Sequence, residues 1–393
     1  MKRISNVMVF RLIYFLVYFA DALFTPFYGL YLKGLGFSDM KVGILLGLIP
    51  FSACLGSLII GRLGTHFKRS VLLLKIICLS EALGVLLLGF LTNFYALIVV
   101  VIFLAFVNGV YYQIEDGASS YAAQRESKPY NSIRIFGSIG FGVALVACYF
   151  LLQVWAYRWL FLFAACLFVL IFVLFFFLRP YSDEVLPIAE KKRSGLLMIF
   201  SNRPFLFFFL FYFLLDGSIS IQGYILPLYL NALGFSDSQY SLVNAFRVGI
   251  EIIAVFFYQP IKKLLRNDRN CLLVGGGVLF LSSICILAFH NPWALALTNA
   301  FCRGLGGALL FIGFVNYVSS LLPHSHVTGG LAVCSAMMDV FTGSMNFSAP
   351  AIYTATSFYV FFAINAGIGF LGYLFLFFSK EKKETPSLEP KSL

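Results

Sequence analysis

Long blocks of hydrophobic residues follow one another along nearly the whole chain, with short polar segments between them. Most blocks continue for about 20 residues, the length of α-helix that crosses the roughly 30 Å apolar core of a bilayer. Strands of a membrane barrel would instead alternate in polarity over about ten residues. The pattern predicts an all-α membrane protein with twelve transmembrane helices, placed near 9–32, 41–61, 71–92, 95–121, 132–152, 157–178, 205–230, 238–261, 271–290, 294–321, 328–352 and 357–379.

A nine-residue peptide occurs twice in the chain. Residues 31–39 read YLKGLGFSD and residues 229–237 read YLNALGFSD, so seven of nine positions agree at an offset of 198 in a chain of 393 residues. Each copy follows an apolar stretch that holds a single acid, Asp21 in the first half and Asp216 in the second. A parallel repeat of this kind is typical of transporters built from two similar bundles.

The repeat and one polar stretch in the middle of the chain together predict the domain organisation. We expect two pseudo-symmetric six-helix bundles at 1–178 and 205–379, joined by a cytoplasmic linker at 179–204. The last residues, 380–393, are rich in charge, Pro and Ser and are expected to form a disordered cytoplasmic tail.

Composition and charge support a membrane location. Hydrophobic residues make up 61% of the chain and charged residues 11%, whereas soluble domains hold roughly 25% charged residues. Lys and Arg gather at both ends and in alternate loops, and the remaining loops carry little more than Lys33, Lys41 and Arg158. The positive-inside rule therefore predicts a multi-pass plasma-membrane protein with both termini in the cytoplasm. The net charge of +11 is assigned to these loops and to contact with anionic lipid, not to nucleic acid.

Enzymatic and metal chemistry have no recognisable motif in the sequence. The eight cysteines fall singly inside apolar blocks without metal-ligand spacing, and neither HExxH nor GxSxG occurs. Glu115 and Asp116 are adjacent, so on a helix they point about 100° apart and do not act on one substrate atom. We therefore expect a protein that is not an enzyme and that needs no cofactor or metal.

Ionisable side chains inside the apolar blocks carry the functional prediction. Each costs at least about 2.5 to 3.5 kcal/mol near the bilayer centre unless it has a partner or lines a wet cavity. The residues are Asp21, Glu115, Asp116, Arg134, Asp216, Arg247, Glu251, Arg303 and Asp339. Several lie on polar stripes with spacings of three, four and seven, which put each set on one helix face. Such stripes predict a hydrophilic translocation path between the helices.

Structural roles remain open for single members of this set. Arg247 and Glu251 are four residues apart and could neutralise each other, and other pairs could simply lock helices together. Lys75 can extend to the cytoplasmic surface, and a structural role is favoured for it and for Glu81. Glycines in two of the helices allow either close static packing or bending: Gly137, Gly140, Gly142, Gly304, Gly306 and Gly307.

These features together resemble the major facilitator superfamily over essentially the whole chain. Residues 61–69, GRLGTHFKR, resemble the signature loop that this superfamily carries between its second and third helices. Gly61, Leu63 and Arg69 fit the signature, whereas Thr65 replaces its usual Asp and Lys68 its usual Gly. Lys68 and Arg69 keep the basic cytoplasmic character of the loop. Members of the superfamily mostly act as monomers, and the resemblance implies the same here.

The segment from Asp116 to Gly142 resembles one branch of that superfamily, the oligosaccharide and nucleoside proton symporters. An acid on the fourth helix is followed eighteen residues later by Arg134, which opens RIFGSIGF. The resemblance implies that Asp116 and Arg134 bind substrate hydroxyls, that Phe141 stacks on the substrate and that Glu251 contributes from the eighth helix. Tyr112 and Asn108, on the polar stripe of Asp116, are assigned to the same substrate site. On the tenth and eleventh helices, the residues differ from those that couple protons to transport in lactose permease. This chain has Arg303, Gly306 and Asp339 at the corresponding positions.

The sequence thus predicts a proton-coupled importer of a small polar organic solute, such as a saccharide, a nucleoside or an aromatic acid, working by alternating access. Residues assigned to proton coupling or gating are Asp339, Arg303, Asp21, Asp216 and Arg247. A multidrug or metabolite efflux antiporter is the alternative within transport. A sensor or receptor built on a transporter fold is the alternative from another class.

Overall fold

The computed structural model describes residues 5–60, 66–179, 181 and 202–379. Within these ranges the secondary structure is helical, without strands. The first half contains α1 (Asn6–Ala22), η1 (Thr25–Phe27), α2 (Tyr28–Gly34), α3 (Asp39–Ile60), α4 (Phe67–Phe90), α5 (Phe94–Arg125), α6 (Asn131–Leu151), α7 (Tyr157–Leu174) and η2 (Phe175–Phe177). The second half contains α9 (Arg203–Phe211), η3 (Tyr212–Asp216), α10 (Gly217–Ala232), α11 (Asp237–Phe256), α12 (Tyr258–Leu265), α13 (Asp268–Ala288), α14 (Pro292–Leu321), α15 (His324–Ala355) and α16 (Phe358–Phe378).

Eleven helical segments of the described chain are long and apolar enough to cross a membrane. They correspond to eleven of the twelve apolar blocks that the sequence predicts. The remaining block, 328–352, lies inside α15, a helix of 32 residues that is not among the eleven. The structure therefore confirms a polytopic helical membrane protein, and the twelfth span stays a prediction.

The first predicted span is not one continuous helix. α1 ends at Ala22, a 3₁₀ turn follows at Thr25–Phe27, and α2 continues from Tyr28. Pro26 lies inside this turn, and because proline has no backbone N–H to donate, it cannot continue the α-helical ladder. The seventh predicted span is also interrupted, by a π-helical turn at Tyr212–Asp216 between α9 and α10.

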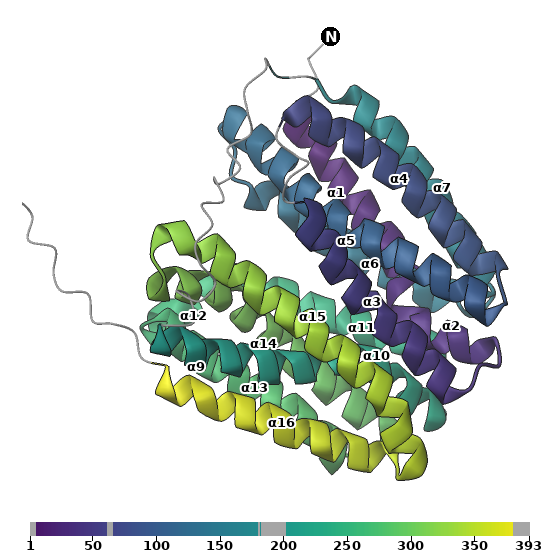
Figure 1. Ribbon diagram of the computed structural model, residues 1–393, viewed down its shortest axis with the longest axis vertical. Helices are drawn as coiled ribbons and strands as arrows, with labels where there is room; N and C mark the ends of the chain where they lie inside the picture. The colour runs from purple at the N-terminus through teal and green to yellow at the C-terminus, as the bar shows by residue number, and fades with distance from the viewer. Residues whose placement is uncertain (1–4, 61–65, 180, 182–201, 380–393) are drawn as a thin grey trace, which may run out of the picture.

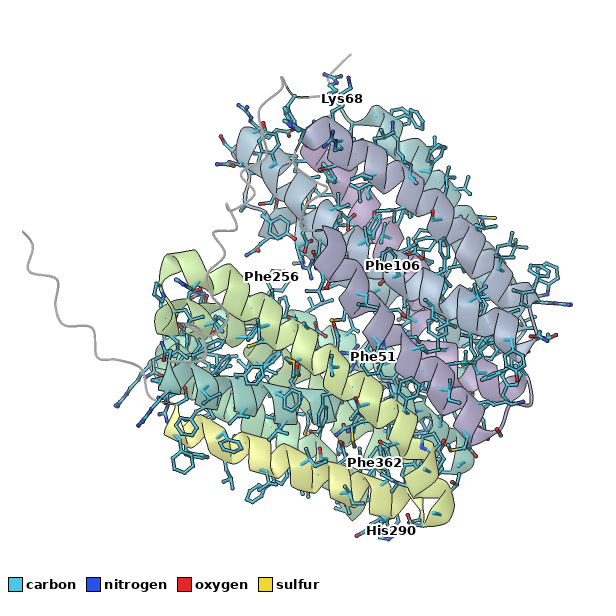
Figure 2. The ribbon with its side chains drawn as sticks, viewed as in Figure 1. Phe51, Lys68, Phe106, Phe256, His290 and Phe362 are labelled. Carbon is cyan, nitrogen blue, oxygen red and sulfur yellow. The ribbon has the colours of Figure 1, made fainter. Side chains whose placement is uncertain are left out.

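The helices of the two sequence halves form two groups that diverge from a shared end (Figure 1). Contacts between the groups run mainly along α3 against α15 and along α6 against α11, with α2 against α10 at the shared end. Lys68, at the start of α4, and His290, between α13 and α14, lie at opposite ends of the molecule (Figure 2). The halves therefore touch at the α2–α10 end and separate towards the end where α4 begins.

Glycines bring α3 and α15 into close contact. A Cβ added at Gly43 would lie 2.3 Å from the Pro350 ring, and one at Gly343 would lie 2.6 Å from the Phe51 ring. Phe51 stacks on Phe347 across this contact with ring centroids 5.7 Å apart, and it lies between the two groups in Figure 2. Bulkier residues at these glycines would force the halves apart.

Most of the glycines singled out from the sequence pack against other helices of their own half. Gly140 faces the backbone of Phe15 on α1, and Gly306 faces the backbone of α13. Gly142, which faces Val248 on α11, joins the two halves, whereas Gly307 has no heavy atom within 4 Å of an added Cβ.

The two copies of the repeated peptide adopt the same conformation. Each ends one helix and begins the next, with Gly36 at φ +82° and Gly234 at φ +86° in the turn between them. The amide of Leu35 donates to the carbonyl of Tyr31, and that of Leu233 donates to the carbonyl of Tyr229. Sequence identity at this offset therefore reflects structural equivalence.

Several sequence predictions fall on residues outside the described ranges. These are Gly61, Leu63 and Thr65 of the signature loop, most of the linker at 179–204 and the tail at 380–393. Lys68 and Arg69 are described and lie exposed in the first turn of α4.

Candidate functional site

Asp116 on α5 is the meeting point of three elements of the first half. Its Oδ1 accepts hydrogen bonds from the hydroxyls of Tyr14 on α1, at 2.7 Å, and Tyr130, at 2.6 Å, and from Nη1 of Arg134 on α6, at 2.9 Å. Tyr130 directly precedes α6. Burial and the neighbouring Asp116 charge raise the pKa of Tyr130 above its ordinary value, so its hydroxyl acts as the donor. Charge-assisted bonds of this kind hold the carboxylate in one orientation.

The Asp116–Arg134 pair is accessible from outside the protein interior. The two side chains are 41% and 35% exposed. The accessible face of this part of α5 is polar, with Gln113, Ser120 and Gln124 exposed on either side of Asp116. A polar face suits water and not lipid, so the pair faces a hydrated space. Because Arg134 contacts Asp116 mainly through Nη1, its remaining N–H groups can donate to a solute.

Aromatic rings surround the same pair. The Arg134 guanidinium lies 5.9 Å from the centroid of the Tyr18 ring, which in turn lies 5.2 Å from the Tyr112 ring. Phe141, seven residues after Arg134 on α6, is half-buried and packs against a hydrophobic core that includes residues of both halves. Flat rings next to charged hydrogen-bonding groups can hold a planar polar molecule.

Tyr112 and Asn108 do not contact Asp116, although the sequence assigns all three to the substrate site. The Tyr112 hydroxyl donates to Oδ2 of Asp21 on α1. The Asn108 amide lies close to the carboxyls of Asp21 and of Glu81 on α4. Their separation from Asp116 follows from the helix itself, because residues four and eight positions away lie one and two turns along the axis.

Asp21 and Glu81 are both buried and lie within electrostatic reach of each other, and neither has a cationic partner among the described residues. Their exposures are 4% and 1%. Oδ1 of Asp21 and both carboxylate oxygens of Glu81 make no well-formed hydrogen bond, even with Asn108 nearby. The sequence favoured a structural role for Glu81, and it gave no sign that Asp21 lies beside it. Glu115, fully buried, accepts from the Tyr111 hydroxyl at 3.1 Å and also leaves one oxygen without a partner.

The second half carries its own polar cluster on α11. Arg247 binds Glu251 at 3.1 Å and Asn244 at 2.8 Å. This is the pairing that the spacing of four residues suggested. Glu251 remains 39% exposed, so it can accept a further hydrogen bond.

Arg303 on α14 does not pair with Asp339, contrary to the predicted grouping of these two residues. In the described part of the chain no ion pair joins them, and the charge of Arg303 interacts instead with Arg247, Asp216 and Glu251. Asp216 ends the π-helical turn η3 and also interacts with Tyr212. Asp339 lies on α15 near Cys54 of α3, at the contact between the halves. The structure thus brings Arg247 and Asp216 within electrostatic reach of Arg303, whereas Asp21 lies near Glu81 and Asp339 lies at the contact with α3.

Sequence reasoning missed the tyrosines that bind Asp116. Neither Tyr14 nor Tyr130 is among the predicted site residues. A buried amide and hydroxyl network in the second half was also missed. There Gln222 donates to Ser283 at 2.8 Å, and Asn299 donates to Gln222 at 3.1 Å. The apolar blocks that contain these residues predicted transmembrane helices and gave no indication of a polar network.

A polytopic helical fold that carries partly exposed ion pairs on its helices is typical of membrane transport proteins. The family model of the MFS_1 like family matches residues 7–346. The chain belongs to this family, which confirms the resemblance to the major facilitator superfamily.

Known proteins agree with this assignment. The uncharacterized transporter YwbF of Bacillus subtilis (strain 168) is 25% identical over 281 residues, which are 69% of this chain and 68% of the relative. The crystal structure of the nucleoside transporter NupG superposes with a TM-score of 0.78 at 16% identity, over 96% of this chain and all of that one. A mutant of the peptide transporter POT gives a TM-score of 0.74 at 15% identity, over 94% and 93% of the two chains. At these identities the structural likeness shows a shared fold.

Proposed function

We propose that this protein is a proton-coupled symporter that imports a small polar organic solute by alternating access. The observation that carries the proposal is the Asp116–Arg134 pair, which is held by tyrosines yet open to a hydrated face of the first half. The Arg247–Glu251 pair offers similar chemistry in the second half. Partly exposed ion pairs in both halves of an otherwise apolar fold suit a path for polar cargo.

We favour a solute with a flat ring and hydroxyl groups, of which a nucleoside is the leading example. Arg134 can donate to hydroxyl or carbonyl oxygens, Asp116 can accept from hydroxyls, and Tyr18 offers a ring face beside them. The fold shared with a nucleoside transporter is consistent with this choice. Saccharides, which offer hydroxyls without a flat ring, and aromatic acids, which offer a flat ring with a carboxylate, are the other candidate solutes.

We propose that Asp21 and Glu81 carry the coupling proton. Two carboxyls buried side by side without a cation are costly to ionise together, and a proton relieves that cost. Tyr112 links Asp21 to Tyr18, whose ring lies beside Arg134, so a change at the acidic pair can reach the substrate site. Asp339 and Arg303 are the alternative coupling residues.

The proposal includes a topology. α15 crosses the membrane as the twelfth span, and the end where α4 begins faces the cytoplasm, as the distribution of Lys and Arg indicates. The halves diverge towards that end (Figure 1), so the structure corresponds to an inward-facing state.

The test is uptake by the purified protein in proteoliposomes. Labelled nucleosides, sugars and aromatic acids are supplied with and without an inward proton gradient. We expect concentrative uptake of one class, strongest for nucleosides, that collapses when a proton uncoupler is added. Asp116→Asn should remove most of this uptake. Gradient-independent uptake of every solute would overturn the coupling, and no uptake of any class would overturn the choice of cargo.

Efflux by proton antiport is the second candidate function, because many exposed and half-buried Phe residues allow an apolar cavity. Everted vesicles that expel hydrophobic cations, together with proteoliposomes that take up none of the polar solutes, would favour it.

A further inference from the structure

A cavity that shares no lining residue with the Asp116–Arg134 site lies in the first half. Its volume is about 540 Å³, and it is formed where α4 begins and α7 passes into η2. Its lining residues include Lys68, Arg69, Leu72, Lys75, Phe175 and Leu178. We propose that this cavity binds the headgroup of an anionic phospholipid of the bilayer.

The charged part of the lining is basic. Lys68 and Arg69 are exposed in the first turn of α4, and Lys75 lies about two turns further along the same helix. Among the described residues, no carboxylate lines the cavity and no ion pair engages these three side chains. Lys68 and Arg69 can therefore bind the phosphate of a phospholipid, and Lys75, which lies deeper along α4, can bind the glycerol esters of the same lipid.

Lys75 is held where it can serve such a ligand. Its Nζ lies 3.5 Å from the centroid of the Phe176 ring, and the side chain is half-buried. The face of the Phe176 ring attracts the ammonium group and holds it at the edge of the cavity. The N–H groups that point away from the ring remain free to donate hydrogen bonds to a ligand.

An exposed apolar stripe continues from the cavity along α4. Leu72, Ile76, Leu79 and Leu83 are spaced by four, three and four residues, and their exposures are between 44% and 58%. Phe176 and Phe177 are also exposed, at 62% and 56%, beside the cavity mouth. A free phosphate would use only the basic residues, whereas a phospholipid can also lay an acyl chain on the stripe. The basic lining of the cavity and the apolar stripe on α4 together favour a phospholipid over a free phosphate.

The experiment compares lipids and matched variants of the full chain. Native mass spectrometry of the purified protein measures retention of phosphatidylglycerol against phosphatidylcholine of the same acyl composition. The double variant K68Q/R69Q and the single variant K75Q remove charge from the cavity. The control K263Q/R266Q removes two charges from α12 and the residue that follows it, which lie in the second half, away from the cavity.

We expect the protein to retain phosphatidylglycerol preferentially, and K68Q/R69Q to weaken that retention about tenfold or more. K75Q should weaken it by a smaller factor, and the control should retain lipid as the unsubstituted protein does. Size-exclusion profiles show whether each variant is folded. Equal retention by K68Q/R69Q and the control would overturn the proposal. Displacement of the lipid by inorganic phosphate alone would also overturn it, because the site would then recognise a free anion.

Discussion

Asp116 gains its chemistry from two other parts of the chain. Tyr14 comes from α1, and Tyr130 and Arg134 come from the start of α6, yet all three donate to the same carboxylate oxygen. Such an arrangement orients the acid and leaves Arg134 partly free, which is what recognition of a polar solute requires.

Arg134→Lys tests this arrangement at the scale of one residue. Lysine keeps the positive charge but loses the planar fork, so it cannot bind Asp116 and a solute at the same time with good geometry. We expect a 10- to 100-fold fall in uptake efficiency, in line with the loss of about 1.5 to 3 kcal/mol for a charged hydrogen bond. Initial uptake rates over a range of substrate concentrations measure it. The control is Arg158→Lys, at an exposed position outside the site. An unchanged efficiency for Arg134→Lys would contradict direct binding.

Glu81→Gln tests the coupling pair. The amide keeps the shape of the side chain but cannot release a proton. We therefore expect downhill uptake to continue while accumulation against a gradient is lost. Glu81→Asp, which retains an acid, should preserve accumulation at least in part. If Glu81→Gln still concentrates substrate and responds to uncouplers while Asp339→Asn does not, coupling belongs to Asp339.

The sequence groups the candidate site residues by resemblance and by helix face, and the structure shows which of them lie in contact. Asp116 and Arg134 were assigned to one site on a resemblance, and the structure joins them. Asn108 and Tyr112 were assigned to that site because they share a helix face with Asp116, but helical periodicity fixes direction and not depth, and they contact Asp21 and Glu81 instead. Arg303 was grouped with Asp339, although only tertiary packing decides which acid an arginine meets.

At the scale of elements, hydrophobic block length located the helices well. The break between α1 and α2 was not foreseen, because hydropathy averages over a window and does not register the local effect of Pro26. The π-helical turn before α10 was missed for a related reason. An extra residue in one turn changes the hydrogen-bond ladder without changing composition.

The turns after α2 and α10 allow an element-scale prediction. Gly36 and Gly234 adopt positive φ, where a side chain is strained, although an added Cβ would meet no neighbour. Gly36→Ala and Gly234→Ala should each destabilise the protein by about 1 kcal/mol. Thermal unfolding of the purified protein measures this. Gly34→Ala, inside α2 with an ordinary φ and open space, should be neutral or slightly stabilising. Equal midpoints for Gly36→Ala and Gly34→Ala would argue against backbone strain as the cause.

At the scale of the whole molecule, the repeated peptide connects the two halves. Asp39, at the end of the first copy, accepts a hydrogen bond from Tyr353 of α15 at 3.2 Å. Asp237, at the end of the second copy, accepts one from Tyr157 of α7. Both contacts lie at the end where the halves meet, so they hold that end shut in this state.

Removing these two hydroxyls should shift the balance between conformations. We expect Tyr157→Phe and Tyr353→Phe each to raise the population opened at this end by about tenfold, and the double variant to raise it further. Spin labels at Met40 and Leu233, which are exposed on either side of the contact, would report longer distances in the variants. Tyr95→Phe, at an exposed ring, is the control. Unchanged distances in the double variant would show that the bonds do not govern closure.

The exchange of acid and tyrosine between the halves has an implication for the origin of the chain. Tyr157 begins the last helix of the first half, and Tyr353 stands just before the last helix of the second, so the two contacts are near-equivalents under the repeat. In a twofold homodimer, each subunit donates to its partner the same hydrogen bond that it accepts from that partner. The ancestor can thus be pictured as a single bundle that self-associated through two identical bonds, which gene fusion later preserved inside one polypeptide.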